Sequence, residues 1–280
     1  MTIYNEDCLG LLPGAEPSAS DAAPAEPTPT GMDRIADGSV DFILCDLPYG
    51  MTDNDTDGID LDRVWAQYRR VIKPNGVLAL TAVQPFTTTL GASNREWLRY
   101  GCVWIKSHPT NFLWASAMPL RDHEDVLIFS PVTLGNMTYN AQGLIPCHKK
   151  RRNSGHSKNW GVIGPKSEDA RENGLYQEFE NYPRTALHYA LDRPTIHSTQ
   201  KPVGLFEYLV RTYSNEGELV LDNTMGSGTT GVACMNSDRE FIGFEMNPEF
   251  FDKAKKRLEE HAETLANRKV AAHNLMSLFA

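Results

Sequence analysis

The chain has 280 residues, of which 41% are hydrophobic and 22% are charged, with a formal net charge of -9. This composition is typical of a soluble globular protein, and the length allows one large domain or two small ones. Without a signal-peptide pattern or an apolar run of about 18 residues, a cytoplasmic protein that does not span a membrane is expected. The five cysteines form no C-x-x-C pair and the histidines lack ligand spacing, so we expect reduced thiols and no metal site.

The first half of the chain predicts a strand–helix–strand unit. Residues 2–8, "TIYNEDC", predict a short strand that ends at Asp7. Residues 13–31 are rich in Pro, Ala, Ser and Thr and lack apolar periodicity, which predicts a disordered surface loop. The apolar run "SVDFILC" predicts a buried strand, "DLDRVWAQYRRVIKPNG" a helix with its stop signal, and "VLALTAV" the next strand. A parallel sheet is therefore expected here.

The second half alternates strands, helices and one long irregular region. "GCVWIK" and "EDVLIFS" predict two strands that bracket a loop at 107–123, and residues 131–196 show poor periodicity. Regular structure resumes with the helix "KPVGLFEYLVRTYS" and the strand "ELVLD", followed by a glycine turn and a helix. The strand "EFIGFE" and the amphipathic helix "PEFFDKAKKRLEEHAETL" complete the order.

The glycine turn predicts a nucleotide-like ligand. Gly226, Gly228 and Gly231 satisfy G-x-G-x-x-G directly after a strand, and Glu245 follows at the end of the next strand. A dinucleotide would place its pyrophosphate on the helix N-terminus. S-adenosylmethionine has the same adenosine but no phosphate, and its methionine end could use polar groups near the turn: Asp222, Ser227, Thr229 and Thr230. The turn alone leaves both ligands open.

The stretch "DLPYG" predicts a second site. Asp46 follows the buried strand directly, which is where an open α/β sheet places ligand groups. Pro48 fixes the backbone and Tyr49 offers a flat face for stacking. A carboxylate and a backbone carbonyl beside an aromatic ring suit a planar base whose exocyclic amino group donates two hydrogen bonds.

These motifs together resemble the amino-group DNA methyltransferases that use S-adenosylmethionine. "DLPYG" is similar to their D-P-P-Y motif, "LDNTMGSGTTGVAC" to their cofactor loop and "HSTQKP" to their T-x-K-P segment. The catalytic motif precedes the cofactor motif, which resembles the circularly permuted order of the β group. Leu47 stands where the family commonly has Pro, and Thr224 stands where many members have Phe.

The resemblance implies a Rossmann-like α/β methyltransferase fold, circularly permuted, with a mostly parallel twisted sheet and helices on both faces. It implies a single domain, 1–280, with a target-recognition insert at approximately 107–196. The implied catalytic residues are Asp46, Pro48 and Tyr49. The implied cofactor-binding residues are Asp7, Lys201, Asp222, Thr224, Gly226, Ser227, Gly228, Thr229, Thr230 and Glu245. For Asp7, a role as a turn residue stays equally open.

A basic run indicates where DNA would bind. Residues 148–158, "HKKRRNSGHSK", contain no acid, and their candidate phosphate-binding residues are Lys149, Lys150, Arg151, Arg152 and Lys158. A solvated loop or a nuclear import signal are the other interpretations. Asn111, Phe112 and Trp114 are candidates for entering the DNA, although aromatic residues in such loops more often belong to the core.

The function implied by the resemblance is methylation of adenine N6 in double-stranded DNA, with the target base flipped out of the duplex. Cytosine N4 stays open, although cytosine-N4 enzymes usually have Ser in place of Asp46. A dinucleotide-dependent oxidoreductase and a catalytically silent DNA-binding relative are the alternatives of other classes. Cys147 in "IPCHK" is rejected as a cytosine-C5 nucleophile, because it lies in a polar stretch predicted to be unstructured. A homodimer and a restriction endonuclease partner are both left open.

Overall fold

A computed structural model describes residues 1–10, 29–49, 58–152, 176–193, 195 and 200–277. Most of the predicted disordered loop at 13–31 lies outside these ranges. Its last residue, Gly31, is described and is buried at the start of a short 3₁₀ helix, η1 (Gly31–Arg34), so the predicted loop extends one residue too far.

An eight-stranded sheet forms the centre of the molecule, in the order β1-β10-β9-β2-β3-β5-β4-β8. Neighbouring strands are parallel except in the two pairs that contain β5, which confirms the mostly parallel sheet. The strands are β1 (Thr2–Tyr4), β2 (Val40–Asp46), β3 (Ile72–Ala82), β4 (Leu98–Thr110), β5 (Arg121–Phe129), β8 (Ala186–His188), β9 (Leu219–Asp222) and β10 (Glu240–Phe244).

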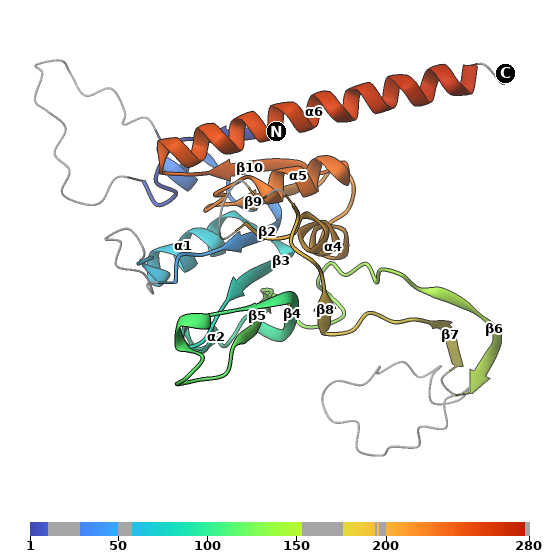
Figure 1. The fold of residues 1–280 in the computed structure, drawn as a ribbon, viewed down its shortest axis with the longest axis horizontal. Helices are drawn as coiled ribbons and strands as arrows, with labels where there is room; N and C mark the ends of the chain where they lie inside the picture. The colour runs from blue at the N-terminus through green and yellow to red at the C-terminus, as the bar shows by residue number, and fades with distance from the viewer. Residues whose placement is uncertain (11–28, 50–57, 153–175, 194, 196–199, 278–280) are drawn as a thin grey trace, which may run out of the picture.

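Helices cover both faces of this sheet, as predicted (Figure 1). The helices α1 (Leu61–Val71) and α2 (Phe86–Ser93) cover one face, and α4 (Val203–Tyr213), α5 (Thr229–Asn236) and α6 (Pro248–Ser277) cover the other. Along β2, Ile43 and Cys45 pack in the α1 core, whereas Phe42 and Leu44 pack in the α4 core. Both faces of β2 are therefore buried, which explains its uninterrupted apolar sequence.

The first strand of the chain lies beside the last one, β10, which fits the circularly permuted order. β1 pairs in parallel with β10, with Thr2 opposite Ile242 and Tyr4 opposite Phe244. The strand ends at Tyr4, three residues earlier than predicted, because Asn5 turns away and its side chain donates to the carbonyl of Glu245 at 2.8 Å.

Several predicted boundaries were wrong. β3 begins at Ile72, directly after α1, so the expected stop signal "KPNG" lies within a strand, at an irregularity in the pairing with β2. The loop between β4 and β5 is shorter than predicted, because β4 continues to Thr110 and β5 begins at Arg121. α2 was not predicted, and α6 continues to Ser277.

The region predicted to be irregular contains a separate two-stranded antiparallel sheet, β6 (Ile145–Arg152) and β7 (Tyr176–Glu180). The segment before β6 is anchored at the C-terminal end of α4, where the Asn140 side chain donates to the carbonyl of Ser214 at 3.1 Å. β6 and β7 therefore extend from the amino edge of the main sheet, away from the edge toward which β2 and β10 point (Figure 1).

Candidate active site

Three carboxylates gather at the carboxyl edge of the sheet. Asp46 ends β2, Asp222 ends β9, and Glu245 directly follows β10. These strands are neighbours and run in parallel, so their ends meet at one edge. The sequence placed all three residues at strand ends, and the structure brings them together.

Asp46 is held by three donors. The hydroxyl groups of Tyr49 and Thr81 both donate to its Oδ1 atom. The ammonium group of Lys201 donates to Oδ2 at 2.5 Å. An ionised carboxylate accepts about four hydrogen bonds, so the described residues leave about one acceptor position of Asp46 open.

Lys201 is the buried cation of this cluster, with a side chain that is only 7% exposed. Its Nζ atom also lies 3.3 Å from Glu124, which pairs with Lys106 at 2.6 Å. Burial alone would lower the pKa of Lys201, but the charges of Asp46 and Glu124 outweigh it and raise this pKa. Lys201 was predicted among the cofactor residues, and the structure places its ammonium group on the predicted catalytic carboxylate.

The aromatic ring predicted to stack on a base stands beside Asp46. Tyr49 is half-buried, and its ring lies 5.4 Å from the ring of Phe86 on α2, tilted by 36°. Burial and the neighbouring carboxylate of Asp46 raise the pKa of Tyr49 well above its usual range, so its hydroxyl stays a donor. Pro48 is half-buried, and Leu47 is buried in the core, where an apolar side chain can replace the usual proline.

The first glycine of the turn leaves room for a ligand, whereas a Cβ on Gly228 would lie 3.4 Å from Ala254 and Leu258. Gly226 and Gly228 have φ values of 48° and 73°, in the left-handed region that favours glycine. No atom lies within 4 Å of the position that a Cβ on Gly226 would take. The Gly226 N–H donates to Glu245 Oε2 at 3.0 Å, so this acid lies directly over the turn.

The third glycine serves packing. A Cβ on Gly231 would lie 2.7 Å from Leu258 of α6 and 3.0 Å from Phe241 of β10. Glycine at this position therefore allows α5 to approach α6 and the sheet closely.

Asp222 is buried beneath the turn. The hydroxyl of Thr230 and the backbone N–H of Thr224 donate to its carboxylate. Burial raises the pKa of Asp222 to about 7, against the opposing effect of these hydrogen bonds.

Other hydroxyl groups of the turn contact protein atoms. The guanidinium group of Arg257 on α6 donates to Thr229 Oγ1 at 3.1 Å and to the carbonyl of Ser227 at 2.9 Å. The Thr224 hydroxyl donates to the backbone carbonyl of Asp46 at 3.1 Å. This bond joins the glycine turn directly to the "DLPYG" segment.

The segment after β1 also reaches this edge. Buried Asn223 contacts Cys8 at 3.4 Å through its side chain, while Tyr68 and Cys45 donate to its Oδ1 atom. Asp7 lies in the same segment, and its carboxylate accepts from the backbone N–H of Leu9 at 3.0 Å. The described contact of Asp7 is thus a turn contact, and its cofactor role stays a prediction.

The basic run is not part of this site. Lys149 to Arg152 lie on β6, at the opposite edge of the main sheet, and Lys158 lies outside the described residues. The expectation of an unstructured stretch around Cys147 was wrong, because Cys147 lies within β6. It is nevertheless remote from the carboxyl edge.

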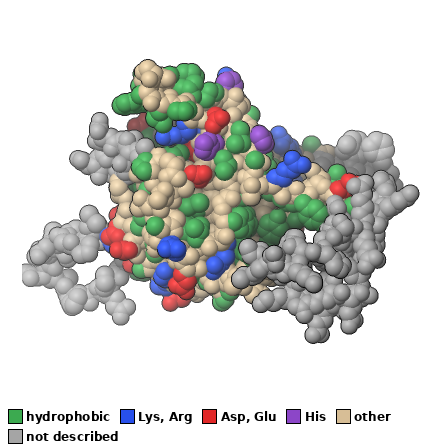
Figure 2. Space-filling view, turned by 90° about the horizontal axis from the view of Figure 1, so that it is seen from below, with side chains coloured by type: hydrophobic (Ala, Val, Ile, Leu, Met, Phe, Trp, Pro, Cys, Tyr) green, Lys and Arg blue, Asp and Glu red, His purple; other side chains and the backbone are tan. Residues whose placement is uncertain are grey.

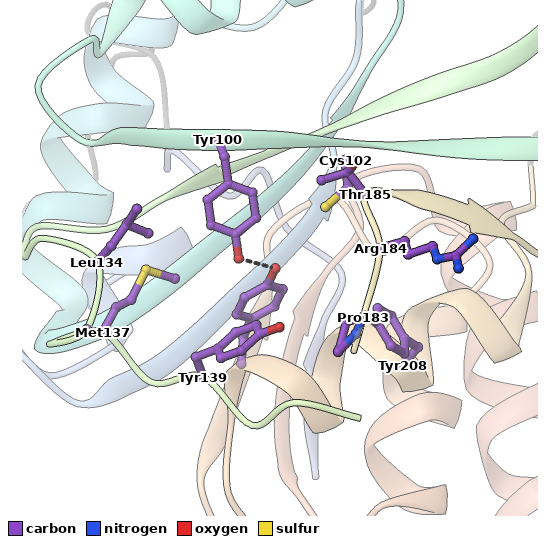
Figure 3. Close-up of a pocket in the computed structure, with 11 residues that line it drawn as sticks. Tyr100, Cys102, Leu134, Met137, Tyr139, Pro183, Arg184, Thr185 and Tyr208 are labelled. Carbon is purple, nitrogen blue, oxygen red and sulfur yellow. Dashed lines mark hydrogen bonds between the residues drawn. The ribbon is translucent and has the colours of Figure 1, made fainter. Parts of the chain in front are cut away.

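A hollow lies away from the carboxylates, near the beginning of β4 (Figure 3). Its volume is about 480 Å³, and its lining includes Tyr100, Tyr139, Tyr208 and Tyr213. The hydroxyls of Tyr100 and Tyr213 lie 2.8 Å apart. Among the described residues, no Asp or Glu lines this hollow.

The sequence did not predict Thr81, Phe86, Lys106, Glu124 or Arg257 as site residues. Each reaches the site from an element distant in sequence, and no motif marks it. Over the described residues, no group of three or more His, Cys, Asp or Glu side chains could hold a metal ion. No helix in the described ranges is both long enough and apolar enough to cross a bilayer.

Comparisons with known proteins give one consistent result. A family model described as DNA methylase matches residues 40–256. The type II methyltransferase M.HpaI of Haemophilus parainfluenzae is 26% identical over 237 residues, covering 81% of this chain and 70% of that protein. The DNA adenine methyltransferase YhdJ of Escherichia coli K12 is 39% identical over 79 residues, covering 28% of this chain and 26% of that protein.

Two solved structures share the fold. The cytosine-N4-specific PvuII DNA methyltransferase has a TM-score of 0.55 at 14% identity, covering 83% of this chain and 86% of that one. TTHA0409 from Thermus thermophilus, complexed with S-adenosyl-L-methionine, has a TM-score of 0.52 at 20% identity, covering 82% of this chain and 89% of that one.

Proposed function

The chain belongs to the DNA methylase family, whose model spans residues 40–256, and from this membership we propose a specific activity. The protein transfers a methyl group from S-adenosylmethionine to the exocyclic N6 atom of adenine in double-stranded DNA. The observation that carries this proposal is the hydrogen bond from Thr224 to the carbonyl of Asp46. It joins the glycine turn and the base-binding segment into one site.

The glycine turn fits the adenosine and methionine parts of this cofactor better than a pyrophosphate. The space beside Gly226 is open, and Glu245 stands over it as an acceptor for ribose hydroxyls. A pyrophosphate would need the Gly226 N–H, which Glu245 already uses, and it would face two carboxylates. When bound, S-adenosylmethionine supplies an electrophilic methyl group on a sulfonium.

Asp46 orients the amino group of the target base. The lone pair of that nitrogen is delocalised into the ring, which makes it a poor nucleophile. The open acceptor position of Asp46, together with a backbone carbonyl of "DLPYG", would accept its two N–H bonds and favour a pyramidal nitrogen. Lys201 balances the carboxylate charge in a site that excludes much of the water. The net reaction releases one proton from the nitrogen.

Tyr49 holds the ring of the base. Flipping a nucleotide out of the duplex costs a few kcal/mol, and stacking on an aromatic side chain returns roughly 1–3 kcal/mol. Phe86 packs against Tyr49 and supports this face.

Asp46 favours adenine over cytosine as the target base. The cytosine-N4 members of the amino-group DNA methyltransferases usually have Ser at this position. The local similarity to the adenine methyltransferase YhdJ supports the same base. Duplex DNA is the substrate in this proposal, with phosphate contacts from β6 and sequence recognition within residues 107–196. The type II relative M.HpaI supports the proposal of a partner restriction endonuclease, and a homodimer stays a prediction.

The proposal is tested by incubating the protein with unmethylated genomic DNA and S-adenosylmethionine, digesting the DNA and analysing the nucleosides by mass spectrometry. N6-methyladenine supports the proposal. N4-methylcytosine corrects the target base, and the absence of any methylated nucleoside, with cofactor binding intact, contradicts DNA methylation.

A further inference from the structure

The hairpin formed by β4 and β5 projects beyond the catalytic edge. β3 ends at Ala82, which pairs with Asp125, but β5 begins four residues earlier at Arg121. β4 runs beside this extension as far as Thr110. Because Glu124 on the extension contacts Lys201, the projecting hairpin stands directly beside Asp46. In Figure 1 its green tip lies on the side toward which β2 and β10 point.

The tip of this hairpin is defined as residues 111–120. Its large apolar side chains face solvent: Phe112 is 66% exposed, Leu113 96%, Trp114 59% and Met118 44%. A cluster of this kind indicates a contact surface. Figure 2 shows a protruding lobe with many hydrophobic side chains, and with histidine, basic and acidic side chains beside it.

The tip has a defined backbone conformation. Asn111 adopts φ 76° and begins the short helix η2 (Phe112–Trp114). The N–H groups of Ala117 and Met118 donate to the carbonyl of Trp114 at 2.8 and 2.9 Å. The apolar side chains are therefore presented on a preformed turn, which lowers the entropy lost on contact.

The tip itself carries no acidic side chain that would repel a polyanion. Residues 107–120 contain no Asp, Glu, Lys or Arg, in a chain whose net charge is -9. At their foot, Arg121 is followed by Asp122, and buried Lys106 is paired with Glu124. An exposed apolar tip without acidic residues suits a nucleic acid duplex, in which side chains can insert between the apolar faces of stacked bases. The tip stands beside the site that is proposed to act on DNA, so the duplex rather than a second copy is taken as its occupant.

We propose that the tip inserts into the DNA duplex beside the target base, with Leu113 and Trp114 filling the space that the flipped base leaves. The inference rests on the proposed function and adds a positioning role to it. The tip lowers the free-energy cost of flipping, because inserted side chains restore stacking with the neighbouring bases. Asp46 and Tyr49 then receive the extruded base at the foot of the same hairpin.

The test uses the full-length protein and a double variant, Leu113→Ala with Trp114→Ala. Both side chains are largely exposed, so the melting temperature should stay unchanged. The target sequence is first mapped by sequencing DNA that the wild-type protein has methylated. Two synthetic duplexes then carry this site, one with the target base paired and one with it opposite an abasic position. Val270→Ala, at an exposed site of α6, is the matched control.

For the double variant, we expect kcat/KM to fall by about 10- to 100-fold on the paired duplex. It should return to within about threefold of wild type on the abasic duplex, where the base is already unpaired. Val270→Ala should behave as wild type on both.

Three results would overturn the inference: unchanged activity on the paired duplex, an equal loss on both duplexes, or a wild-type dimer that the double variant turns into a monomer. Sedimentation velocity detects the last result, which would assign the tip to a second copy. A wild-type protein that methylates no DNA would instead contradict the underlying function.

Discussion

In the proposed mechanism, Asp46 is the carboxylate that orients the reacting amino group. It accepts from Tyr49, Thr81 and Lys201, which come from a turn, a neighbouring strand and the segment before α4. Few rotamers satisfy three donors of such different origin, so the carboxylate is fixed before a base arrives.

Tyr49 should affect the rate without being essential. Tyr49→Ala removes the stacking surface, and kcat/KM for DNA methylation should fall by about 5- to 150-fold. Tyr49→Phe keeps the ring and loses only the hydrogen bond to Asp46, so its loss should be smaller. Steady-state kinetics on one duplex measure both variants. Full activity of Tyr49→Ala would remove this ring from the mechanism.

Asp222 should make stability depend on pH. Its pKa rises from 3.8 to about 7 on folding, so the folded protein holds a proton that the unfolded chain releases. This stabilisation is complete below pH 3.8 and disappears as the pH rises through about 7. Relative to Asp222→Asn, the wild-type free energy of unfolding should fall by about 2 kcal/mol between pH 5 and pH 7. Urea unfolding at both pH values measures the difference, and a constant difference would contradict this assignment.

At the residue scale, the positions of site residues could be predicted from the sequence where a motif stands at the end of a strand. Asp46, Asp222 and Glu245 were placed correctly, because continuous apolar runs marked the strands before them. Glu124 and Lys106 were not predicted, since they reach the site only through the antiparallel pairing of β4, β5 and β3. That pairing joins segments far apart in the chain, and no local signal encodes it.

At the scale of single elements, the glycines of the turn serve different purposes, ligand binding at one position and packing at another. Gly226 borders open space, whereas Gly231 lies against Leu258 and Phe241. The same change to alanine should therefore affect ligand binding at one position and folding at the other.

Gly226→Ala should weaken S-adenosylmethionine binding by at least about 10-fold, because the new methyl group enters the ligand space. Its positive φ adds a strain of about 1 kcal/mol to the folded state. Gly231→Ala should instead lower the free energy of unfolding by about 1–3 kcal/mol through overpacking. Calorimetry of cofactor binding and urea unfolding measure the two effects. If both variants lost cofactor affinity to a similar extent and had the same free energy of unfolding, the two glycines would not have the different roles assigned here.

Elements were predicted best where burial imposes a pattern. β2, α1, α4 and β10 pack on the core, and their apolar periodicity shows it. The ends of β4 and β5 project beyond the sheet, so "SHPT" and "RDH" carry no such pattern, and both strands were predicted too short. α2, "FTTTLGAS", has weak helix propensity and depends on packing of Leu90 against the sheet.

At the scale of the whole molecule, the two proposed DNA contacts lie at different edges. The active site and the apolar tip share the carboxyl edge, while the basic strand β6 extends from the amino edge. β6 would therefore contact phosphates at a distance from the target base and contribute affinity without taking part in the chemistry.

Replacement of Lys149, Lys150, Arg151 and Arg152 by alanine should weaken DNA binding and reduce its salt dependence. The slope of log K against log salt should decrease in magnitude by up to about 3.6, while kcat at saturating DNA stays unchanged. Fluorescence anisotropy over a salt series measures the slope, with Lys269→Ala on exposed α6 as the control. An unchanged slope would remove β6 from the DNA interface.

The central claim is that Asp46 directs methyl transfer at a site that binds S-adenosylmethionine independently of it. The most direct measurement gives wild type and Asp46→Ala the cofactor with a deuterated methyl group and unmethylated DNA, and follows labelled nucleosides by mass spectrometry and cofactor binding by calorimetry. We expect labelled N6-methyladenine from wild type alone, with similar cofactor affinity in both proteins. Labelled product from Asp46→Ala at the wild-type rate, or loss of its cofactor binding, would contradict the account.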